Sequence, residues 1–388
     1  MTAERPAAVV VGLCAHGLAI SRALAREGVE VHALEANLAL PGAATRCATV
    51  HAARDINAPA LIDELLELRS RLGDGPDPVL LVTNDRMVRV LGTHGDRLRG
   101  RYRLSWDRSA ETVLRLADKG SLEARCRETG LHYPATVAVG SREASSEVGK
   151  TLDYPVIVKP TRPLAGFKTA IVRSTRDLED LIDAHPADLP VIAQQWIEGT
   201  DEAIHFSALY LDDGRVVARF DGHKLRSRPM GHTTIAESYP SDEVFDLTRR
   251  FFDGLAMSGP VSLEVKRDPK GRWWVIEPTV GRTDFWLDVC VRNGVNLPYV
   301  EYCHQSGLPI PATEQATSTV WFHTERDPQG VVWYVTSGRA RTRGWRALRF
   351  SYFDRSDFGP HLRSLRVTLS RNGRRVTGRV RRAMQVQA

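Results

Sequence analysis

Short apolar runs alternate with helical patterns along the first 108 residues. The apolar runs are of the kind that forms strands buried in a parallel sheet, and they cover residues 7–12, 29–34 and 79–82. Apolar side chains at helical spacing predict helices over residues 17–27 and 63–72. Strands that alternate with helices at this spacing are typical of β-α-β units. The pattern therefore predicts an α/β domain over residues 1–108.

From about residue 110 the pattern changes to short helices and strands, and later to strands around a single helix. The first group predicts helices over residues 110–116 and 119–128 and strands over 136–139, 154–159 and 170–173. The second group predicts one helix, residues 242–256, and strands over 191–196, 203–211, 216–221, 261–266 and 273–277. Turns rich in Gly and Asp at residues 212–214 and 269–271 predict hairpins. We therefore expect two lobes, 109–190 and 191–311, and an extension over residues 312–388.

Composition places the chain among folded proteins. It has 388 residues, of which 42% are hydrophobic and 26% charged, so it can bury several cores. No apolar run approaches a membrane span, and the N-terminus shows neither the basic head nor the cleavage site of a signal peptide. The five cysteines form no C-x-x-C pair, which argues against a disulfide framework and a zinc site. We therefore expect a cytoplasmic protein.

Positive charge gathers at the C-terminal end. Residues 331–388 contain fourteen Arg, no Lys and two acidic residues, a local charge of +12, so the first 330 residues carry −6 of the total +6. This extension could meet an anionic membrane surface, an acidic or nucleic-acid partner, or the acidic body of the protein itself. Nucleic acid is the least favoured partner, because no recognised binding fold accompanies the charge.

Lysine is scarce, and its few positions attract attention. Only seven of the 53 basic residues are Lys, so each of them can mark a place where a compact ammonium cannot be exchanged for a guanidinium. Lys119 opens a helix, Lys159 ends a buried strand, and Lys168 closes the loop 161–168. Three such cations would suit a triphosphate. The alternative is that each ammonium extends to water beside an apolar stem.

An apolar strand ending in an acidic turn lies at residues 191–202. Free backbone groups and an amide side chain in such a linker between two lobes can read the edge of an adenine, and an acid shortly afterwards can accept bonds from ribose hydroxyls. The alternative is a core strand followed by a solvated turn.

Two carboxylates lie on successive strands. Glu264 and Glu277 flank the predicted hairpin turn, so antiparallel pairing would bring them together on one face of the sheet. Facing carboxylates repel unless a cation lies between them, and hard oxygen ligands with phosphate oxygens suit Mg²⁺. Arg282 follows and could neutralise charge on a transferred phosphoryl or acyl oxygen. A solvent-facing pair is the alternative.

The N-terminal turn contains an incomplete dinucleotide fingerprint. Gly12 and Gly17 follow the first strand, and Glu35 ends the second, where a ribose would be held. The middle glycine is absent. An NAD(P)-dependent oxidoreductase using this domain is the alternative function from a different class.

The ordered set of these elements resembles the ATP-grasp superfamily. The resemblance covers roughly residues 1–311 and is carried by Lys119, the Val-Ile-Val-Lys-Pro strand at 156–160, the Gln-Gln-Trp-Ile-Glu-Gly hinge at 194–199, and the pair Glu264 and Glu277. It implies a Rossmann-like preATP-grasp domain, a two-lobed ATP-grasp fold of the α+β type, and a basic extension. The family usually phosphorylates a carboxylate with ATP and lets an amine attack the acyl phosphate.

The resemblance also implies a role for each site residue. Phosphates would be held by Lys119 and Lys159, with Lys168 as a third cation, adenine by Gln194, Gln195, Trp196 and Ile197, ribose by Asp201 or Glu202, and Mg²⁺ by Glu264, Glu277 and Thr279. Two departures stand out. The family's Glu-x-Asn-x-Arg has Thr279 in place of Asn and Arg282 one position late, and the phosphate loop contains only Gly166. A hydroxyl is a poorer Mg²⁺ ligand than an amide oxygen, which leaves the number of metal ions open.

Residues 222–231, 237–238 and 264–269 resemble a branch of carboxylate–amine ligases related to D-aspartate ligases and exopolysaccharide-cluster enzymes. Lys224, Arg226 and Arg228 alternate along an extended stretch, which would place them on one face toward a carboxylate or phosphate substrate. The expected function is ATP-dependent ligation of a small-molecule carboxylate to an amine, with Lys224, Arg226 and Arg282 as catalytic residues. A nucleotide-binding protein without chemistry is a further alternative, and homo-oligomerisation is left open.

Overall fold

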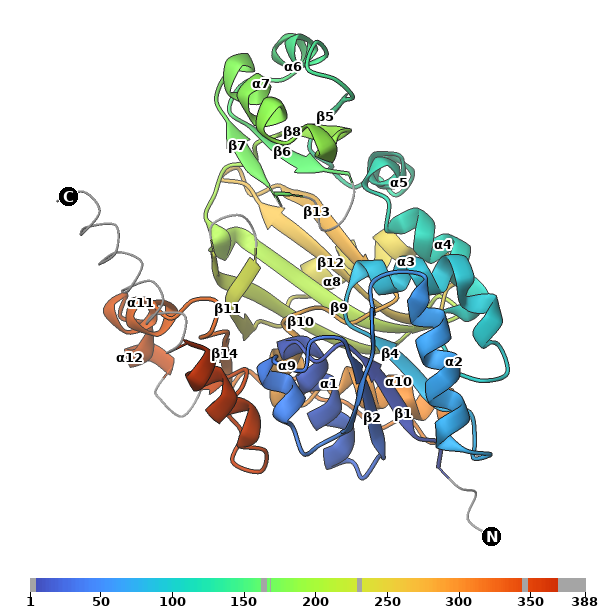
Figure 1. The fold of residues 1–388 in the computed structure, drawn as a ribbon. Coiled ribbons are helices and arrows are strands. Elements are labelled where there is room, and N and C mark those ends of the chain that lie inside the picture. The colour runs from blue at the N-terminus through green and yellow to red at the C-terminus, as the bar shows by residue number, and fades with distance from the viewer. Residues whose placement is uncertain (1–4, 162–165, 168, 229–231, 344–347, 369–388) are drawn as a thin grey trace, which may run out of the picture.

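The fold was described from a computed structural model, which describes residues 5–161, 166–167, 169–228, 232–343 and 348–368. Three β-sheets organise these residues (Figure 1). Lys168 and residues 162–165 of the predicted phosphate loop lie outside the described residues.

The first sheet is parallel, with the strand order β3-β2-β1-β4. Its strands and the helices that follow them are β1 (Ala8–Val11), α1 (Ala15–Arg26), β2 (Val31–Glu35), β3 (Thr49–Ala52), α2 (Ala60–Leu72), β4 (Val79–Val82) and α3 (Asp85–His94). The short helices α4 (Ala110–Leu116) and α5 (Leu122–Glu128) come next. The predicted parallel sheet with alternating helices is confirmed, although β3 was not predicted. Strand β3 escaped prediction because none of its residues is buried.

The second sheet is antiparallel and small, with the order β5-β8-β6-β7. Its strands are β5 (Thr136–Val139), β6 (Val156–Pro160), β7 (Ala170–Val172) and β8 (Val191–Gln195). Helices α6 (Ser145–Thr151) and α7 (Thr175–Ala184) complete the lobe and share one apolar core with the sheet. Figure 1 shows this lobe at the top, next to β13.

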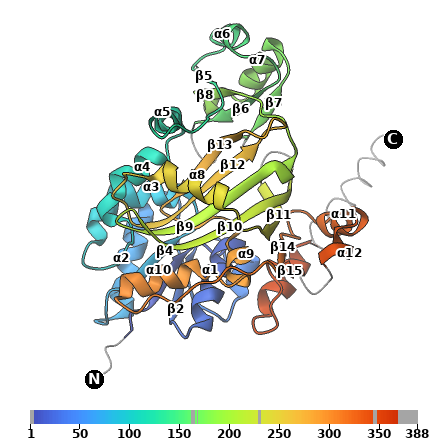
Figure 2. The same ribbon diagram turned by 180° about the vertical axis from the view of Figure 1, so that it is seen from behind.

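The third sheet is the largest, with the order β13-β12-β9-β10-β11-β14-β15. Its strands are β9 (Ile204–Asp212), β10 (Arg215–Arg228), β11 (His232–Ser238), β12 (Gly259–Arg267), β13 (Trp273–Val280), β14 (Val320–Phe322) and β15 (Leu348–Phe350). Helix α8 (Asp242–Phe252) packs on β9, β10 and β12 (Figure 2). Helices α9 (Leu287–Arg292) and α10 (Leu297–Ser306) contact both α1 and strands of the large sheet. These two helices therefore join the large sheet to the N-terminal domain.

The described part of the C-terminal extension packs on the body. β14 pairs with β11 and β15 pairs with β14, so residues of the predicted extension lie in the same sheet as the predicted large lobe. Helices α11 (Gly330–Thr336) and α12 (Arg339–Arg343) connect these two strands, and residues 359–368 are helical. Of the three interpretations of this basic segment, its packing against the body is therefore observed for the described part. The boundaries at residues 108, 190 and 311 stay predictions.

Within the described residues, no helix combines the length and the hydrophobicity that crossing a membrane requires.

Candidate functional site

The small sheet places Lys159 beside Gln194. Strands β6 and β8 are antiparallel neighbours, with Ile157 opposite Gln194 and Lys159 opposite Ile192. The Lys159 Nζ donates to Gln194 Oε1 at 2.9 Å, and Gln194 Nε2 donates to Thr136 Oγ1 at 3.0 Å. The side chains of Lys159 and Gln194 are buried. A buried ammonium and a buried amide are therefore held in one short network in this sheet.

Tyr133 connects this network to the large sheet. Burial raises the pKa of Tyr133 to about 12, its hydroxyl is hydrogen bonded to Gln194, and the charge of Glu277 acts on it. In the same segment, the His132 carbonyl accepts a bond from the Val275 amide at 2.9 Å. Gln194, predicted for adenine, therefore contacts a tyrosine whose pKa is also raised by the charge of Glu277, predicted for metal.

The hinge after β8 is fastened by a lysine that was not predicted for the site. Lys266 Nζ donates to the carbonyls of Ile197 and Gly199, both at 2.8 Å, and lies 4.9 Å from the centre of the Trp196 ring. Burial lowers the pKa of Lys266, and nearby Asp201 opposes that effect. The predicted adenine segment 195–197 therefore has its backbone path fixed by β12. Lysine scarcity was the signal that could have identified Lys266.

The two predicted metal carboxylates are direct partners in the sheet. Glu264 of β12 lies opposite Glu277 of β13, as the hairpin pattern predicted. Lys224 Nζ donates to Glu264 Oε2 at 2.7 Å, and Lys119 Nζ lies 3.4 Å from Glu277 Oε1. The two facing acids therefore lie between two ammonium groups, one on each side.

Burial and neighbouring charges together set the pKa values of Glu264 and Lys224. Burial raises the pKa of Glu264, and Asp284 and Glu277 add to this rise while Lys224 opposes it. Burial also lowers the pKa of Lys224, but Glu264 outweighs that effect, so the net direction is upward. Lys224 therefore stays an ammonium that compensates the charge of Glu264.

The expectation that three cations of β10 share one face is wrong for Lys224 and Arg226. The register of β10 against β11 shifts on both sides of Arg226, which interrupts the alternation of side chains. Lys224 contacts Glu264, whereas Arg226 Nε pairs with Asp327 Oδ2 at 2.6 Å and its guanidinium lies over the Trp333 ring. Arg228 is exposed at the end of the strand. The catalytic roles of Lys224 and Arg226 stay predictions.

The predicted ribose acids contact other parts of the chain. Asp201 Oδ2 accepts the Ser227 amide at 2.6 Å, and Glu202 forms an ion pair with Arg339 of α12. Arg339 also lies 4.8 Å from the centre of the Trp333 ring. Both acids are present at the hinge, and the C-terminal segment holds one of them.

Arg282 joins the large sheet to the N-terminal domain. Its Nε pairs with Asp85 Oδ1 at 2.6 Å, and its Nη1 donates to the Thr283 carbonyl at 3.0 Å. Burial lowers the pKa of Arg282, but Asp85 and Asp284 outweigh that effect and raise it. The guanidinium is therefore permanently charged and held by Asp85, the first residue of α3.

Beside Arg282, His16 of α1 is neutral. Its Nε2 lies 2.7 Å from Thr283 Oγ1 and its Nδ1 lies 3.3 Å from the Thr83 carbonyl. Burial and the charge of Arg282 lower the pKa of His16 to about 4. This contact brings the N-terminus of α1 to the turn that follows β13.

Thr279 contacts an acid that sequence reasoning missed. Its hydroxyl donates to Asp284 Oδ2 at 3.0 Å, and the hydroxyl of Ser262 reaches the same oxygen at 3.5 Å. Gly281 has φ of 71° and turns the chain directly after β13, which brings Asp284 back against the strand it has just left. No sequence pattern around Asp284 predicts that its side chain contacts Thr279.

The described residues contain no group of three or more His, Cys, Asp and Glu side chains able to hold a metal ion by itself. Glu264 and Glu277 offer two carboxylates, and Mg²⁺ is usually bound through one or two carboxylates together with phosphate oxygens. The pair therefore fits a metal that arrives with a phosphate-bearing ligand.

The N-terminal turn is occupied by the protein itself. Both carboxylate oxygens of Glu35 accept backbone amides, Leu13 at 2.5 Å and Asn37 at 2.7 Å, and the side chain is buried. A Cβ on Gly17 would lie 1.8 Å from the Gly12 carbonyl oxygen, so this glycine serves the close approach of α1 to β1. These observations do not favour a dinucleotide at this turn.

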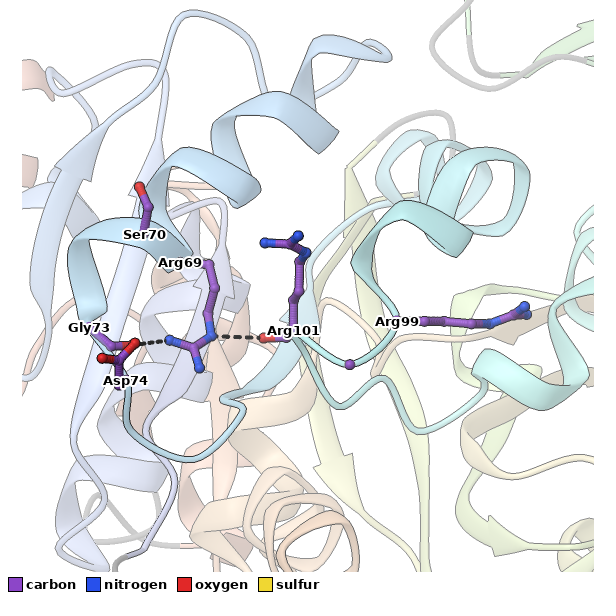
Figure 3. A pocket seen from close by; sticks show the side chains of 7 residues that line it. Arg69, Ser70, Gly73, Asp74, Arg99 and Arg101 are labelled. Carbon is purple, nitrogen blue, oxygen red and sulfur yellow. Dashed lines mark hydrogen bonds between the residues drawn. The ribbon is translucent and has the colours of Figure 1, made fainter.

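Two cavities lie outside the residues predicted for the site. Figure 3 shows one of about 420 Å³ at the end of α2, where Arg69 donates to the carbonyls of Gly73, Gly75 and Arg101. The other, of about 790 Å³, is lined by residues such as Ser105 and His304. No residue predicted for nucleotide or metal lines either cavity.

The chain is similar in sequence to known ligases. It is 26% identical over 205 residues to D-alanine–D-alanine ligase B of Pseudomonas putida, a match that spans 48% of this chain and 61% of that enzyme. It is 28% identical over 184 residues to the D-alanine–D-alanine ligase of Halorhodospira halophila, spanning 44% of this chain and 59% of that one. The chain thus spans about three fifths of the length of these relatives. No family model matches the chain.

Solved structures share the fold over most of the chain. N5-carboxyaminoimidazole ribonucleotide synthetase in complex with ADP has a TM-score of 0.65 at 14% identity and covers 87% of both chains. The biotin carboxylase domain of the 2-oxoglutarate carboxylase of Hydrogenobacter thermophilus, in complex with MgADP, has a TM-score of 0.64 at 12% identity, covering 82% of this chain and 74% of that one. L-amino acid ligase from Bacillus licheniformis has a TM-score of 0.58 at 15% identity, covering 82% and 79%. These likenesses confirm the predicted fold.

Proposed function

We propose that the chain is a member of the ATP-grasp superfamily and an ATP- and Mg²⁺-dependent ligase that joins a small-molecule carboxylate to an amine. The reaction would proceed through an acyl phosphate. A carboxylate oxygen attacks the terminal phosphorus of ATP and ADP leaves; the amine then attacks the acyl carbon, phosphate leaves, and the amine loses a proton.

One observation carries this proposal: the facing pair Glu264 and Glu277 lies between Lys224 and Lys119, next to the small sheet that holds Lys159. Two carboxylates flanked by two ammonium groups suit a magnesium-bound polyphosphate. Solved structures of similar fold support it, since they are complexes with ADP, MgADP and ATP.

The cation roles follow from the position of each ammonium. We assign the phosphates to Lys119 and Lys159, which come from the start of a helix and from the small sheet. Lys224 is bonded to Glu264, so we assign to it the task of holding that carboxylate in place. The ammonium of Lys266 holds the hinge carbonyls, and we assign residues 194–197 to the adenine.

Arg282 has the task of charge neutralisation. Phosphoryl transfer leaves the protein mainly positioning and electrostatic stabilisation, and a fixed guanidinium costs no reorganisation during the reaction. Its ion pair with Asp85 sets its orientation from the N-terminal domain. We therefore expect Arg282 to stabilise negative charge on the transferred group.

The proposal is tested by two substitutions and a substrate panel. Lys159→Ala and Glu277→Ala should each lower ADP formation at least about 100-fold, because each removes a group that meets the phosphates or their metal. The measurement is ADP release with amino acids and other small carboxylates, each offered with an amine. Melting temperatures identify variants that fail to fold.

Lys150→Ala is the matched control. Lys150 is an exposed lysine that pairs with Glu147 on the surface of the small lobe, so its loss should leave ADP formation unchanged. Undiminished turnover in both Lys159→Ala and Glu277→Ala would overturn the assignment. Wild-type protein that binds a non-hydrolysable ATP analogue, yet releases no ADP with any pair of substrates, would instead favour a binding protein without chemistry.

A further inference from the structure

The face that carries the two glutamates also carries two hydroxyls. Thr279 lies two residues after Glu277 on β13 and opposite Ser262, which lies two residues before Glu264 on β12. Residues two apart on a strand share a face. Glu264, Glu277, Ser262 and Thr279 therefore form a four-cornered patch, in which both Ser262 and Thr279 are buried and Thr279 is the corner next to Glu277 along β13.

Asp284 fixes where the proton of Thr279 points. A carboxylate only accepts, so in the 3.0 Å contact between Thr279 Oγ1 and Asp284 Oδ2 the hydroxyl must donate. The other carboxylate oxygen of Asp284 accepts the Phe285 amide at 2.6 Å, so the carboxylate itself is held by the turn. With its proton committed to Asp284, the Thr279 hydroxyl keeps its lone pairs for a different neighbour.

A hydroxyl that donates its proton to a carboxylate in this way becomes a stronger metal ligand. Hydrogen bonds polarise one another, and a hydroxyl that donates to a carboxylate has a more electron-rich oxygen. Groups that bind metals are commonly held and made more basic by a carboxylate behind them, and the loss of that partner costs about 10–100-fold in metal affinity. The family pattern places an amide at this corner, which needs no such help.

We propose that Asp284 is a positioning residue that turns the Thr279 hydroxyl into an effective third ligand for the magnesium ion at Glu264 and Glu277. The inference rests on the proposed function, because it concerns the metal of the same nucleotide site. It also explains how a threonine can stand where the superfamily usually has asparagine.

The test measures metal dependence without turnover. Binding of adenylyl-imidodiphosphate, a non-hydrolysable ATP analogue, is followed by calorimetry across a series of Mg²⁺ concentrations. Asp284→Asn should raise the half-saturating Mg²⁺ concentration about tenfold. Thr279→Val, which removes the hydroxyl at nearly constant volume, should do the same, and the double variant should be no worse than either alone.

Restoring the family's amide gives the sharpest comparison. In a Thr279→Asn background the amide oxygen no longer depends on Asp284, so adding Asp284→Asn should change the Mg²⁺ requirement by less than about threefold. Asp288→Asn is the control, since this acid pairs with Arg292 within α9. If Asp284→Asn fails to fold, the test compares Thr279→Val with Thr279→Asn. The first should raise the half-saturating Mg²⁺ concentration and the second should not.

Two results would contradict the inference. One is an unchanged Mg²⁺ requirement in both Asp284→Asn and Thr279→Val while the wild type shows clear Mg²⁺ dependence. The other is an equal loss from Asp284→Asn in the threonine and asparagine backgrounds, which would mean that Asp284 acts through its charge alone. If the wild type binds the analogue at no Mg²⁺ concentration, the proposed function itself fails.

Discussion

Three buried lysines of this protein each have defined hydrogen-bond acceptors. Lys159, Lys224 and Lys266 are nearly inaccessible, and they donate to an amide, a carboxylate and two backbone carbonyls respectively. A charge leaves water only at a high free-energy cost unless such partners replace it. The scarcity of lysine was therefore informative, because three of the seven lysines occupy positions of this kind.

Glu301 is a buried acid that pairs with a neutral hydroxyl and not with a cation. We therefore expect the stability of the protein to depend on pH through this residue. It is buried in α10 and accepts a bond from Ser105 Oγ at 2.6 Å. Burial raises its pKa from 4.5 to about 7, so the folded protein retains a proton that the unfolded chain has lost. Stability should consequently fall as pH rises from about 5 to about 7 and then level off, by roughly 3 kcal/mol in total.

Glu301→Gln should remove this dependence, because glutamine is neutral at every pH and can still accept the Ser105 bond. Thermal unfolding of both proteins at pH 5 and pH 8 measures the difference. The variant should be more stable relative to the wild type at pH 8 than at pH 5, where the difference in melting temperature should be small. Glu147→Gln, an exposed surface acid, serves as the control and should follow the wild type. If the stability of Glu301→Gln changed with pH as that of the wild type does, the inference that Glu301 keeps its proton in the folded protein would be wrong.

At the scale of elements, α1 depends on one close contact. Gly17 lies in the first turn of α1 and the backbone of Gly12 approaches it so closely that any side chain would collide with a carbonyl oxygen. The contact lets α1 reach β1 and β2 as well as α9 and α10. Gly12 and Gly17 of the incomplete dinucleotide fingerprint thus allow α1 to pack closely against the end of β1.

Gly17→Ala should destabilise the protein by about 3 kcal/mol or more, because the added Cβ meets rigid backbone and cannot be accommodated by a side-chain rotation. Urea unfolding measures the loss. Gly95→Ala is matched to it, since Gly95 has φ of −65° and a Cβ added there would meet no heavy atom within 4 Å. A Gly17→Ala protein as stable as Gly95→Ala would show that α1 can shift away from β1 without cost.

At the scale of the whole molecule, the C-terminal segment is part of the body. Asp357 receives Arg22 Nε at 2.8 Å, the Thr45 hydroxyl at 2.7 Å and the Arg46 amide at 2.9 Å, and both Arg22 and Asp357 are almost fully buried. The acidic residues of this basic segment therefore bind arginines of the body. The same segment supplies Arg339 to Glu202 at the hinge.

Asp357→Asn should cost about 3–5 kcal/mol, because it leaves the buried guanidinium of Arg22 without a compensating charge. Urea unfolding gives the free energy directly. Asp246→Asn, which breaks an exposed pair with Arg249, should cost less than about 1 kcal/mol. Equal stability of the two variants would mean that the C-terminal segment contributes little to the folded body.

Hydrophobic periodicity predicted most of the helices and strands that are rich in apolar residues and that pack against segments nearby in the sequence. Strands Val79–Val82 and Thr136–Val139 and helix Ala110–Leu116 match their predicted bounds, and the hairpin placed Glu264 opposite Glu277. Strands β14 and β15 of the C-terminal segment were not predicted, because they join the sheet across long stretches of chain; strand β11 was also not predicted, although it pairs with the preceding strand β10.

The sequence by itself therefore determined the fold class, the order of the sheets' main strands along the chain and the facing carboxylates, since these depend on periodicity and on short-range pairing. Only the tertiary structure decided that Lys224 holds Glu264, that Arg339 holds Glu202, and that Asp284 returns to Thr279. Those contacts arise from side-chain direction, bulges and turns in three dimensions, and one extra residue in a strand is enough to redirect a side chain. A linear pattern carries no trace of such changes.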